Sequence, residues 1–294
     1  MKVIKGFIST ILAIIVIPIV MAFIVYLSTR DIVSKKNVEK LVKDINISNF
    51  LVDENGNYNE LGNDIKDELV KNGLPSEVVD EFVNSKEISD FFSKYAGEFA
   101  DFIINDKEIK QPTAEDISKL INENVDSIVD ELRNKKVEGY EELTDENITL
   151  FKSHVDEISK EIEKELPDIE EAINDSEARE AFRIVRFIFS NVVYMIILGV
   201  IAVLLILIAL LNLKRYGFLI WYGVIFILSS LPFITICKFI SMLETDIDSK
   251  GVVDIINHIF GKLNMYSTGF FIIGAVSIAI AVILRAIDRT NSTN

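Results

Sequence analysis

The residues whose types and spacing most suggest chemistry lie in one short stretch, DENGNYNELGND, at positions 53–64. Oxygen-bearing side chains recur there at alternate positions, and Ca²⁺ in proteins is bound by carboxylate and amide oxygens. The sequence therefore offers calcium as a candidate cofactor. The candidate ligands are Asp53, Asn55, Asn57, Asn59 and Asp64.

Two features of this stretch differ from an EF-hand calcium loop. The glycine, Gly56, stands at the fourth position, whereas the sharp turn of an EF-hand requires it at the sixth. Asp64 occupies the twelfth position and is one methylene shorter than the usual bidentate glutamate. Asn55-Gly56 is instead a strong tight-turn signal. A polar turn explains the stretch better than a metal site does, and calcium stays the weaker alternative.

The remaining candidates for catalysis are few. The chain has two histidines, His154 and His258, and neither lies in an HExxH or similar metal or triad motif. Neighbouring carboxylates such as Glu141 and Glu142 point in different directions on a helix, so they do not form an acid–base pair. No glycine-rich phosphate loop is present. We therefore expect a protein that is not an enzyme and has no catalytic or further cofactor-binding residues.

Four long apolar segments dominate the chain of 294 residues, half of which are hydrophobic. Each segment is free of charged residues and reaches the roughly 20 residues that a helix needs to cross the hydrocarbon core. The first segment is longer than the core of a signal peptide and lacks a small-x-small cleavage site, so we expect it to remain as an anchor. The four predicted spans are residues 7–28, 187–213, 216–237 and 263–284.

Lys and Arg in the short segments predict the orientation. Basic residues are enriched on the cytoplasmic side of membrane proteins. Placing all three basic segments there leaves both termini in the cytoplasm of a plasma-membrane protein and residues 30–186 outside. The residues concerned are Lys2, Lys5, Lys214, Arg215, Arg285 and Arg289.

The negative charge of the protein belongs to the predicted extracytoplasmic segment. Residues 30–186 contain 21 Lys and Arg against 40 Asp and Glu, a net charge of −19, and the rest of the chain sums to +4. Such a surface should repel nucleic acid and anionic headgroups, and should favour cations or basic partners. The alternative is that the charge only keeps the domain soluble. Because Cys237 is the sole cysteine, no intramolecular disulfide supports this domain.

Apolar residues recur at helical spacing through this segment, most clearly over residues 85–103, 113–132 and 144–166. Thr113 and Asp116 have the spacing of a capping box at the start of the second of these helices. The stretch SEAREAFRIVRFIFS, residues 176–190, contains no Pro or Gly, which predicts a continuous, rigid connection into the second span. The predicted fold class is an all-α membrane protein, with four transmembrane helices and an extracytoplasmic helical bundle inserted between the first and second.

The predicted membrane spans contain two patterns that suggest packing. Small residues in the fourth span have small-xxx-small spacing, which predicts contact with another helix of this chain or of a second copy. These residues are Gly274, Ala275, Ser277, Ala279 and Ala281. In the third span we expect Ser229, Ser230 and Thr235 to satisfy backbone carbonyls that Pro232 leaves without an amide partner.

The predicted organisation is an N-terminal anchor (1–29), an acidic helical domain (30–186) and a three-span membrane domain (187–294) with an outer amphipathic loop (238–262). We expect the helical domain to be a binding module: a sensor, a scaffold or an accessory subunit of a membrane or envelope complex. Expected partners are the lipid bilayer and another membrane or envelope protein or a second copy, and not nucleic acid. The alternative is an oligomeric channel or transporter component with this domain as its cap. The anchor, helical bundle and return helix together are similar to the input half of bacterial chemoreceptor-type sensors, a likeness of architecture alone.

Overall fold

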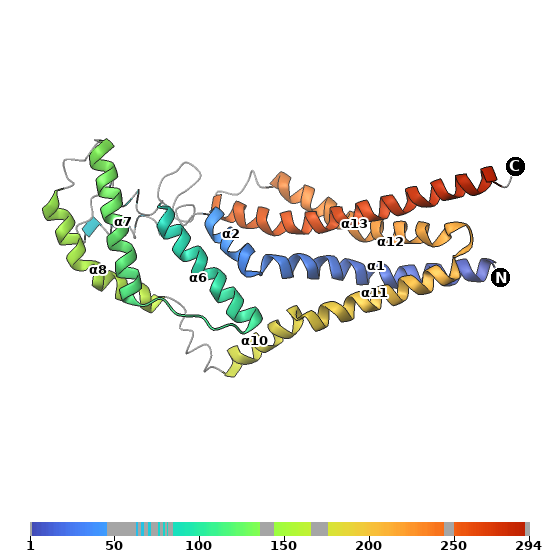
Figure 1. Cartoon of the computed structure of the whole chain (residues 1–294), viewed down its shortest axis with the longest axis horizontal. Helices are drawn as coiled ribbons and strands as arrows, with labels where there is room; N and C mark the ends of the chain where they lie inside the picture. Colours follow the sequence, from blue (N-terminus) through green and yellow to red (C-terminus); the bar gives the residue numbers. More distant parts are fainter. Residues whose placement is uncertain are drawn as a thin grey trace. The chain divides into compact units, whose positions relative to one another are not determined.

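The structure, a computed structural model, contains nine α-helices, one short 3₁₀ turn and no strand in the part of the chain that it describes (Figure 1). The chain divides into two compact units. The membrane unit comprises Met1–Ile32, Phe187–Asp246 and Ile256–Asn294, and the helical unit comprises Val33–Arg186 and Ile247–Ile255. The described residues are 2–45, 63, 66–67, 70–71, 76, 79, 81, 85–135, 144–165, 176–243 and 250–291.

The membrane unit contains four helices that are long and apolar enough to cross a bilayer, in agreement with the four spans expected from the sequence. A 3₁₀ turn, Lys214–Tyr216, joins the second helix to the third. The fourth helix has 42 residues and is therefore about 63 Å long, twice the thickness of a hydrocarbon core. The helices are α1 (Lys2–Ile32), α11 (Asn191–Leu211), α12 (Gly217–Leu243) and α13 (Lys250–Asn291).

Helix α1 supplies five of the eight buried residues of the main hydrophobic cluster of this unit, because it packs against both α11 and α12. Val16, Val20 and Ile24 lie four residues apart on one face, and each is fully buried. On α11, by contrast, Val203 and Ile206 are more than half exposed, which is typical of apolar side chains that face lipid. The apolar stripe of α1 therefore holds the spans together.

Helices α12 and α13 meet backbone to backbone at two glycines. A Cβ atom added to Gly223 would lie 2.7 Å from the carbonyl oxygen of Gly274, and one added to Gly274 would lie 2.9 Å from that of Gly223. Both distances are shorter than real Cβ contacts. Only glycine allows the two helices to approach this closely at this point.

The hydroxyl groups near Pro232 bond differently from the sequence prediction. Proline removes the amide partner of the carbonyl four residues earlier, which is that of Leu228. Ser229 instead donates across to the Ile17 carbonyl of α1 at 3.2 Å, and Thr235 donates to Leu231 at 3.0 Å. Ser230 donates to Phe226 at 2.8 Å. The prediction was wrong because Ser229 faces a neighbouring helix, and its bond joins α12 to α1.

The described part of the helical unit contains two pairs of helices and α10, which leads back to the membrane unit. Helix α2 packs along α6, and α7 packs along α8. The core between α7 and α8 includes Val125, Phe151 and Val155, each fully buried. The bounds of these elements are α2 (Lys35–Ile45), α6 (Lys86–Asn105), α7 (Ala114–Lys135), α8 (Asp145–Glu165) and α10 (Ser176–Phe189).

Side-chain caps begin three of these helices. The Ser85 hydroxyl accepts from the Ile88 amide at 3.3 Å at the start of α6. The predicted capping box of α7 is confirmed, because the Thr113 amide donates to Asp116 at 3.1 Å and the Asp116 amide donates to Thr113 Oγ1 at 3.2 Å. Thr144 accepts from the Asn147 amide at the start of α8.

The connection from α10 into the second span is interrupted, contrary to the sequence prediction. Helix α10 ends at Phe189, and Ser190 has an extended backbone with φ −65° and ψ 153°. Its hydroxyl accepts from the Val193 amide at 3.3 Å and so caps α11. Serine ends one helix and begins the next without Pro or Gly, because its side chain replaces the missing backbone partner. The prediction of one rigid helix through this point was wrong.

The segment 238–262, expected as an outer amphipathic loop, is helical wherever the structure describes it. Helix α12 continues to Leu243, and α13 begins at Lys250 and runs without a break into the fourth span. The amphipathic pattern GVVDIINHIFGKLN therefore belongs to the first turns of a membrane-spanning helix and not to a separate element.

Candidate functional site

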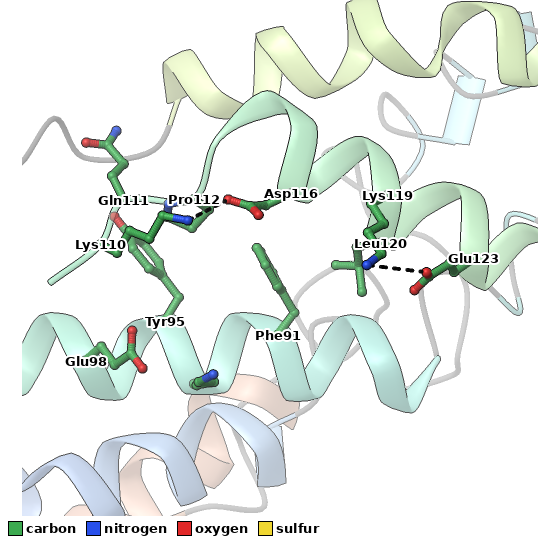
Figure 2. Close-up of a pocket in the computed structure, with 11 residues that line it drawn as sticks. Phe91, Tyr95, Glu98, Lys110, Gln111, Pro112, Asp116, Lys119, Leu120 and Glu123 are labelled. Atoms are coloured by element: carbon green, nitrogen blue, oxygen red, sulfur yellow. Dashed lines mark ion pairs between the residues drawn. The ribbon is translucent and has the colours of Figure 1, made fainter.

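A groove between α6 and α7 is the candidate binding site of the helical unit. It encloses about 510 Å³, within the range of small-molecule pockets. One wall is α6, the other is the start of α7, and the linking segment crosses one end (Figure 2). The lining residues are Phe91, Lys94, Tyr95, Glu98, Lys110, Gln111, Pro112, Asp116, Lys119, Leu120 and Glu123.

Helix termini determine where this α6–α7 groove lies. Helix α6 ends at Asn105, and its C-cap, Asp106, adopts the left-handed conformation with φ 56° and so turns the chain away from the helix axis. The Thr113 capping box then begins α7. At the other end, buried Asn124 of α7 donates to Ser85, the N-cap of α6, at 2.6 Å. The two walls are thus joined by the linking segment at one end and by this hydrogen bond at the other.

The floor of the groove is apolar and includes one polar group without a partner. Phe91, Leu120 and Pro112 contribute carbon surface beside the ring of Tyr95. Tyr95 is only 8% exposed, and its hydroxyl has no hydrogen-bond partner among the residues that the structure describes. In Figure 2 its ring extends from α6 towards the segment that carries Lys110, Gln111 and Pro112. Burial raises the pKa of Tyr95, so the hydroxyl keeps its proton and remains a hydrogen-bond donor.

The rim of the groove carries charges of both signs. Lys110 lies 3.8 Å from Asp116, and Lys119 lies 3.9 Å from Glu123. These contacts are long and join exposed side chains, so they stabilise the fold little. Hydrogen bonds from the Thr113 backbone amide and, to a smaller extent, from the Thr113 hydroxyl lower the pKa of Asp116. The Asp116 carboxylate is therefore ionised at neutral pH. The lysines are free to exchange these carboxylates for an anionic group of a ligand.

Arg186 joins the far end of α6 to α10. Its guanidinium donates to the carbonyls of Ile103 at 3.0 Å and Phe102 at 3.1 Å, and forms an ion pair with Asp106 at 2.5 Å. It also lies over the Phe102 ring, which Phe182 of α10 contacts edge to face. The Phe102 carbonyl also accepts from the Asp106 amide, and a cation at a helix C-terminus stabilises the carbonyls of the last turn. Arg186 therefore ties the C-terminal end of α6 to α10 within the helical unit.

The sequence analysis did not single out Tyr95 as a ligand contact or Arg186 as a connecting residue. Tyr95 lies within the helix predicted over residues 85–103, and helical spacing alone does not distinguish a core residue from a ligand contact. A basic residue near a helix end was visible at position 186, but nothing in the sequence shows that the carbonyls it binds belong to α6.

The five small residues predicted to pack lie on two faces of α13. Gly274 and Ala281 are buried, and Ser277 is half-buried. Ala275 and Ala279 are exposed. The contact of Gly274 is with Gly223 of the same chain, as described above.

The calcium hypothesis lies outside the described residues, since none of its five ligands, Asp53, Asn55, Asn57, Asn59 and Asp64, is among them. Within the described ranges, no group of three or more His, Cys, Asp or Glu side chains has a metal-binding arrangement. His154 Nδ1 lies 2.9 Å from the Leu150 carbonyl on its own helix, α8.

Charged residues also gather at one end of the spans. Lys262 of α13 and Asp31 of α1 form an ion pair at 2.8 Å, and both side chains are about three-quarters buried. Arg30 donates to Asn191 at 2.6 Å and lies over the Tyr194 ring of α11. These contacts fix the ends of three spanning helices to one another, so this cluster acts as a structural anchor.

No protein-family model, curated protein or solved structure matches this chain.

Proposed function

We propose that this is a multipass plasma-membrane protein whose helical unit is an extracytoplasmic binding module, with the α6–α7 groove as its ligand site. The observation that carries the proposal is the buried Tyr95 hydroxyl, which has no partner among the described residues, in an apolar groove of ligand size. A buried donor without a partner is costly, and binding a group that accepts its hydrogen bond removes that cost. The module then serves as a sensor, scaffold or accessory subunit of a membrane or envelope complex.

The groove favours a ligand with an apolar body beside an anionic or carbonyl oxygen. The apolar part would lie on Phe91 and Leu120, and an oxygen would accept from Tyr95 after a small shift of the linking segment. A carboxylate would replace Asp116 or Glu123 as the partner of a rim lysine. A peptide side chain next to a carboxylate has this chemistry, which fits a protein partner in the envelope.

The extracytoplasmic location of this unit rests on the basic residues at the short segments, described above. A direct test uses two variants that each carry a single cysteine, at position 160 or at position 289, in a protein whose own cysteine is removed by Cys237→Ser. The accessibility of each cysteine to a labelling reagent is then measured in intact cells. A reagent that does not cross the membrane should label position 160 and not position 289. Labelling with the reverse pattern would place the helical unit in the cytoplasm.

The binding proposal is tested by photo-crosslinking from the full-length protein in its native membranes. A photoreactive residue replaces Gln111, which lines the groove, or Lys160, an exposed residue of α8 outside it. We expect position 111 to capture a defined partner and position 160 not to, and Leu120→Ala to reduce the capture. Equal capture at both positions, or no capture at 111, would remove the groove as the binding site.

The rival class, an oligomeric channel or transporter, predicts a different observable. Purified protein in liposomes would pass ions or solutes, and changes in the groove would leave that flux unchanged. A flux together with no partner captured at position 111 would favour this class over the binding module.

A further inference from the structure

A second groove of the helical unit, between α2 and α6, is lined mainly by basic residues, whereas the segment that contains it is acidic. It encloses about 580 Å³ and is called the lysine groove here. Five lysines and two carboxylates line it, whereas residues 30–186 as a whole carry nearly twice as many acidic as basic residues. Its residues are Lys35, Lys36, Glu39, Lys40 and Lys43 of α2, and Asp90, Ser93 and Lys94 of α6.

The carboxylates nearby neutralise only part of this charge. Lys43 pairs with Asp90, and Lys35 lies 3.8 Å from Glu39 and 3.9 Å from Glu98. The remaining lysines have weaker or no such partners.

Lys40 lies 4.0 Å from Asp44, and both of these side chains are more than half exposed. Lys36 and Lys94 are exposed, and no ion pair of either is found within the described part of the chain. A net positive charge therefore stays available in the groove for an anion.

The amphipathic pattern of α2 explains why the lysines face outward. Asn37 and Ile45 are buried, while Lys36, Lys40 and Lys43 on the other side are exposed. The packing of α2 on α6 covers the apolar side of the helix. Lysine side chains carry their charge on flexible stems, which lets several of them converge on one phosphate group.

Chain connectivity keeps the first lysines of this groove near the end of a membrane span. Only Val33 and Ser34 separate Lys35 from Ile32, the last residue of α1. Three extended residues cover at most about 11 Å, so α2 begins close to the bilayer surface on whichever side the helical unit lies. The first two lysines of the groove are the first residues of α2.

We infer that the lysine groove binds the phosphate of anionic lipid headgroups in the adjoining leaflet. Clusters of basic residues next to a membrane span attract anionic lipids, and the attraction acts over about one Debye length, roughly 10 Å at 0.1 M salt. Over that distance the local lysines dominate the more distant acidic residues. The net charge predicts repulsion from anionic headgroups, and the inference makes the lysine groove a local exception to it. This inference is independent of the ligand proposed for the α6–α7 groove.

The test titrates phosphatidylglycerol into full-length protein in neutral detergent and counts bound lipids by native mass spectrometry. Phosphatidylcholine with the same acyl chains measures binding that does not depend on net charge. We expect preferential binding of phosphatidylglycerol, and Lys36→Gln with Lys40→Gln should weaken it by about 30-fold, the effect of losing two lysines near an anionic surface.

The matched control, Lys152→Gln with Lys160→Gln, removes two charges from α8 and should leave the preference unchanged. Lys36→Arg with Lys40→Arg keeps the charge and should retain binding, which separates loss of charge from loss of folding. Equal effects of the two Gln pairs, or no effect of either, would overturn the inference. Competition by millimolar inorganic phosphate at unchanged ionic strength would also overturn it, because the groove would then bind free phosphate and not lipid.

Discussion

Tyr95→Phe removes a single oxygen atom, and the structure predicts that the free protein becomes more stable. The Tyr95 ring is 8% exposed and its hydroxyl has no partner within the described residues, so the variant keeps the packing and loses an unpaired polar group. A buried unpaired group costs about 1–3 kcal/mol. We expect Tyr95→Phe to stabilise α6 by about 1 kcal/mol.

Hydrogen exchange of the α6 amides in the full-length protein measures this change. A gain of about 1 kcal/mol slows exchange about fivefold. Tyr222→Phe is the matched control, because the Tyr222 hydroxyl donates to the Leu205 carbonyl at 2.7 Å. Loss of that bond should cost about 1 kcal/mol and make exchange faster around it. If Tyr95→Phe speeds exchange in α6 as much as the control does in α12, the Tyr95 hydroxyl has a partner and the reasoning for the groove fails.

The same substitution has a pH signature. Burial raises the pKa of Tyr95 above its ordinary value of 10.0, so the folded protein binds this proton more tightly than the unfolded chain does. Stability conferred by the neutral form is complete below pH 10 and is lost as the pH rises through the raised pKa. We expect the stability of the native protein to fall more steeply above pH 10 than that of Tyr95→Phe. Parallel profiles would indicate that the hydroxyl is solvated.

Three further substitutions test the packing. Gly274→Ala should destabilise the membrane unit, because its Cβ would lie 2.9 Å from the Gly223 carbonyl oxygen. Gly269→Ala on the same helix meets no atom within 4 Å and should be tolerated. Thermal melting of both variants in detergent compares their stabilities. Arg186→Gln should lower the free energy of local opening in the last turn of α6, measured by hydrogen exchange, by about 1.5–3 kcal/mol. Arg186→Lys should give a value between those of the native protein and Arg186→Gln, since a lysine cannot make all of these contacts at once. Ser190→Ala should cost about 1 kcal/mol and speed exchange of the Val193 amide, and unchanged exchange would show that this cap contributes nothing.

The features that were predictable from the sequence depend on neighbours along the chain. A run of about 20 apolar residues without charge is sufficient to predict a span, and the four spans are helices of the structure. The Thr113–Asp116 capping box was predictable for the same reason, because its two residues are three positions apart. The break at Ser190 is also a local feature, but the absence of Pro and Gly does not predict it, because a serine side chain can cap a new helix.

Features that join distant segments were not predictable. Arg186 contacts carbonyls more than 80 residues earlier in the chain, and Ser229 donates to α1 across 212 residues. The small residues of α13 share a sequence pattern, yet the packing against α12 buries Gly274 and leaves Ala275 exposed. Sequence spacing defines which residues share a helix face, but not which of those faces meets another helix.

The sequence by itself determined the helical class, the four apolar spans and the division of charge along the chain. Those properties follow from composition and short-range periodicity. The tertiary structure alone decided that Tyr95 is buried with no partner in the described part of the chain, that α6 and α7 enclose a groove, and that the lysines of α2 and Lys94 of α6 line a second groove. The physical reason is that burial and electrostatic potential depend on all the atoms within several ångströms, and these come from segments that only folding brings together.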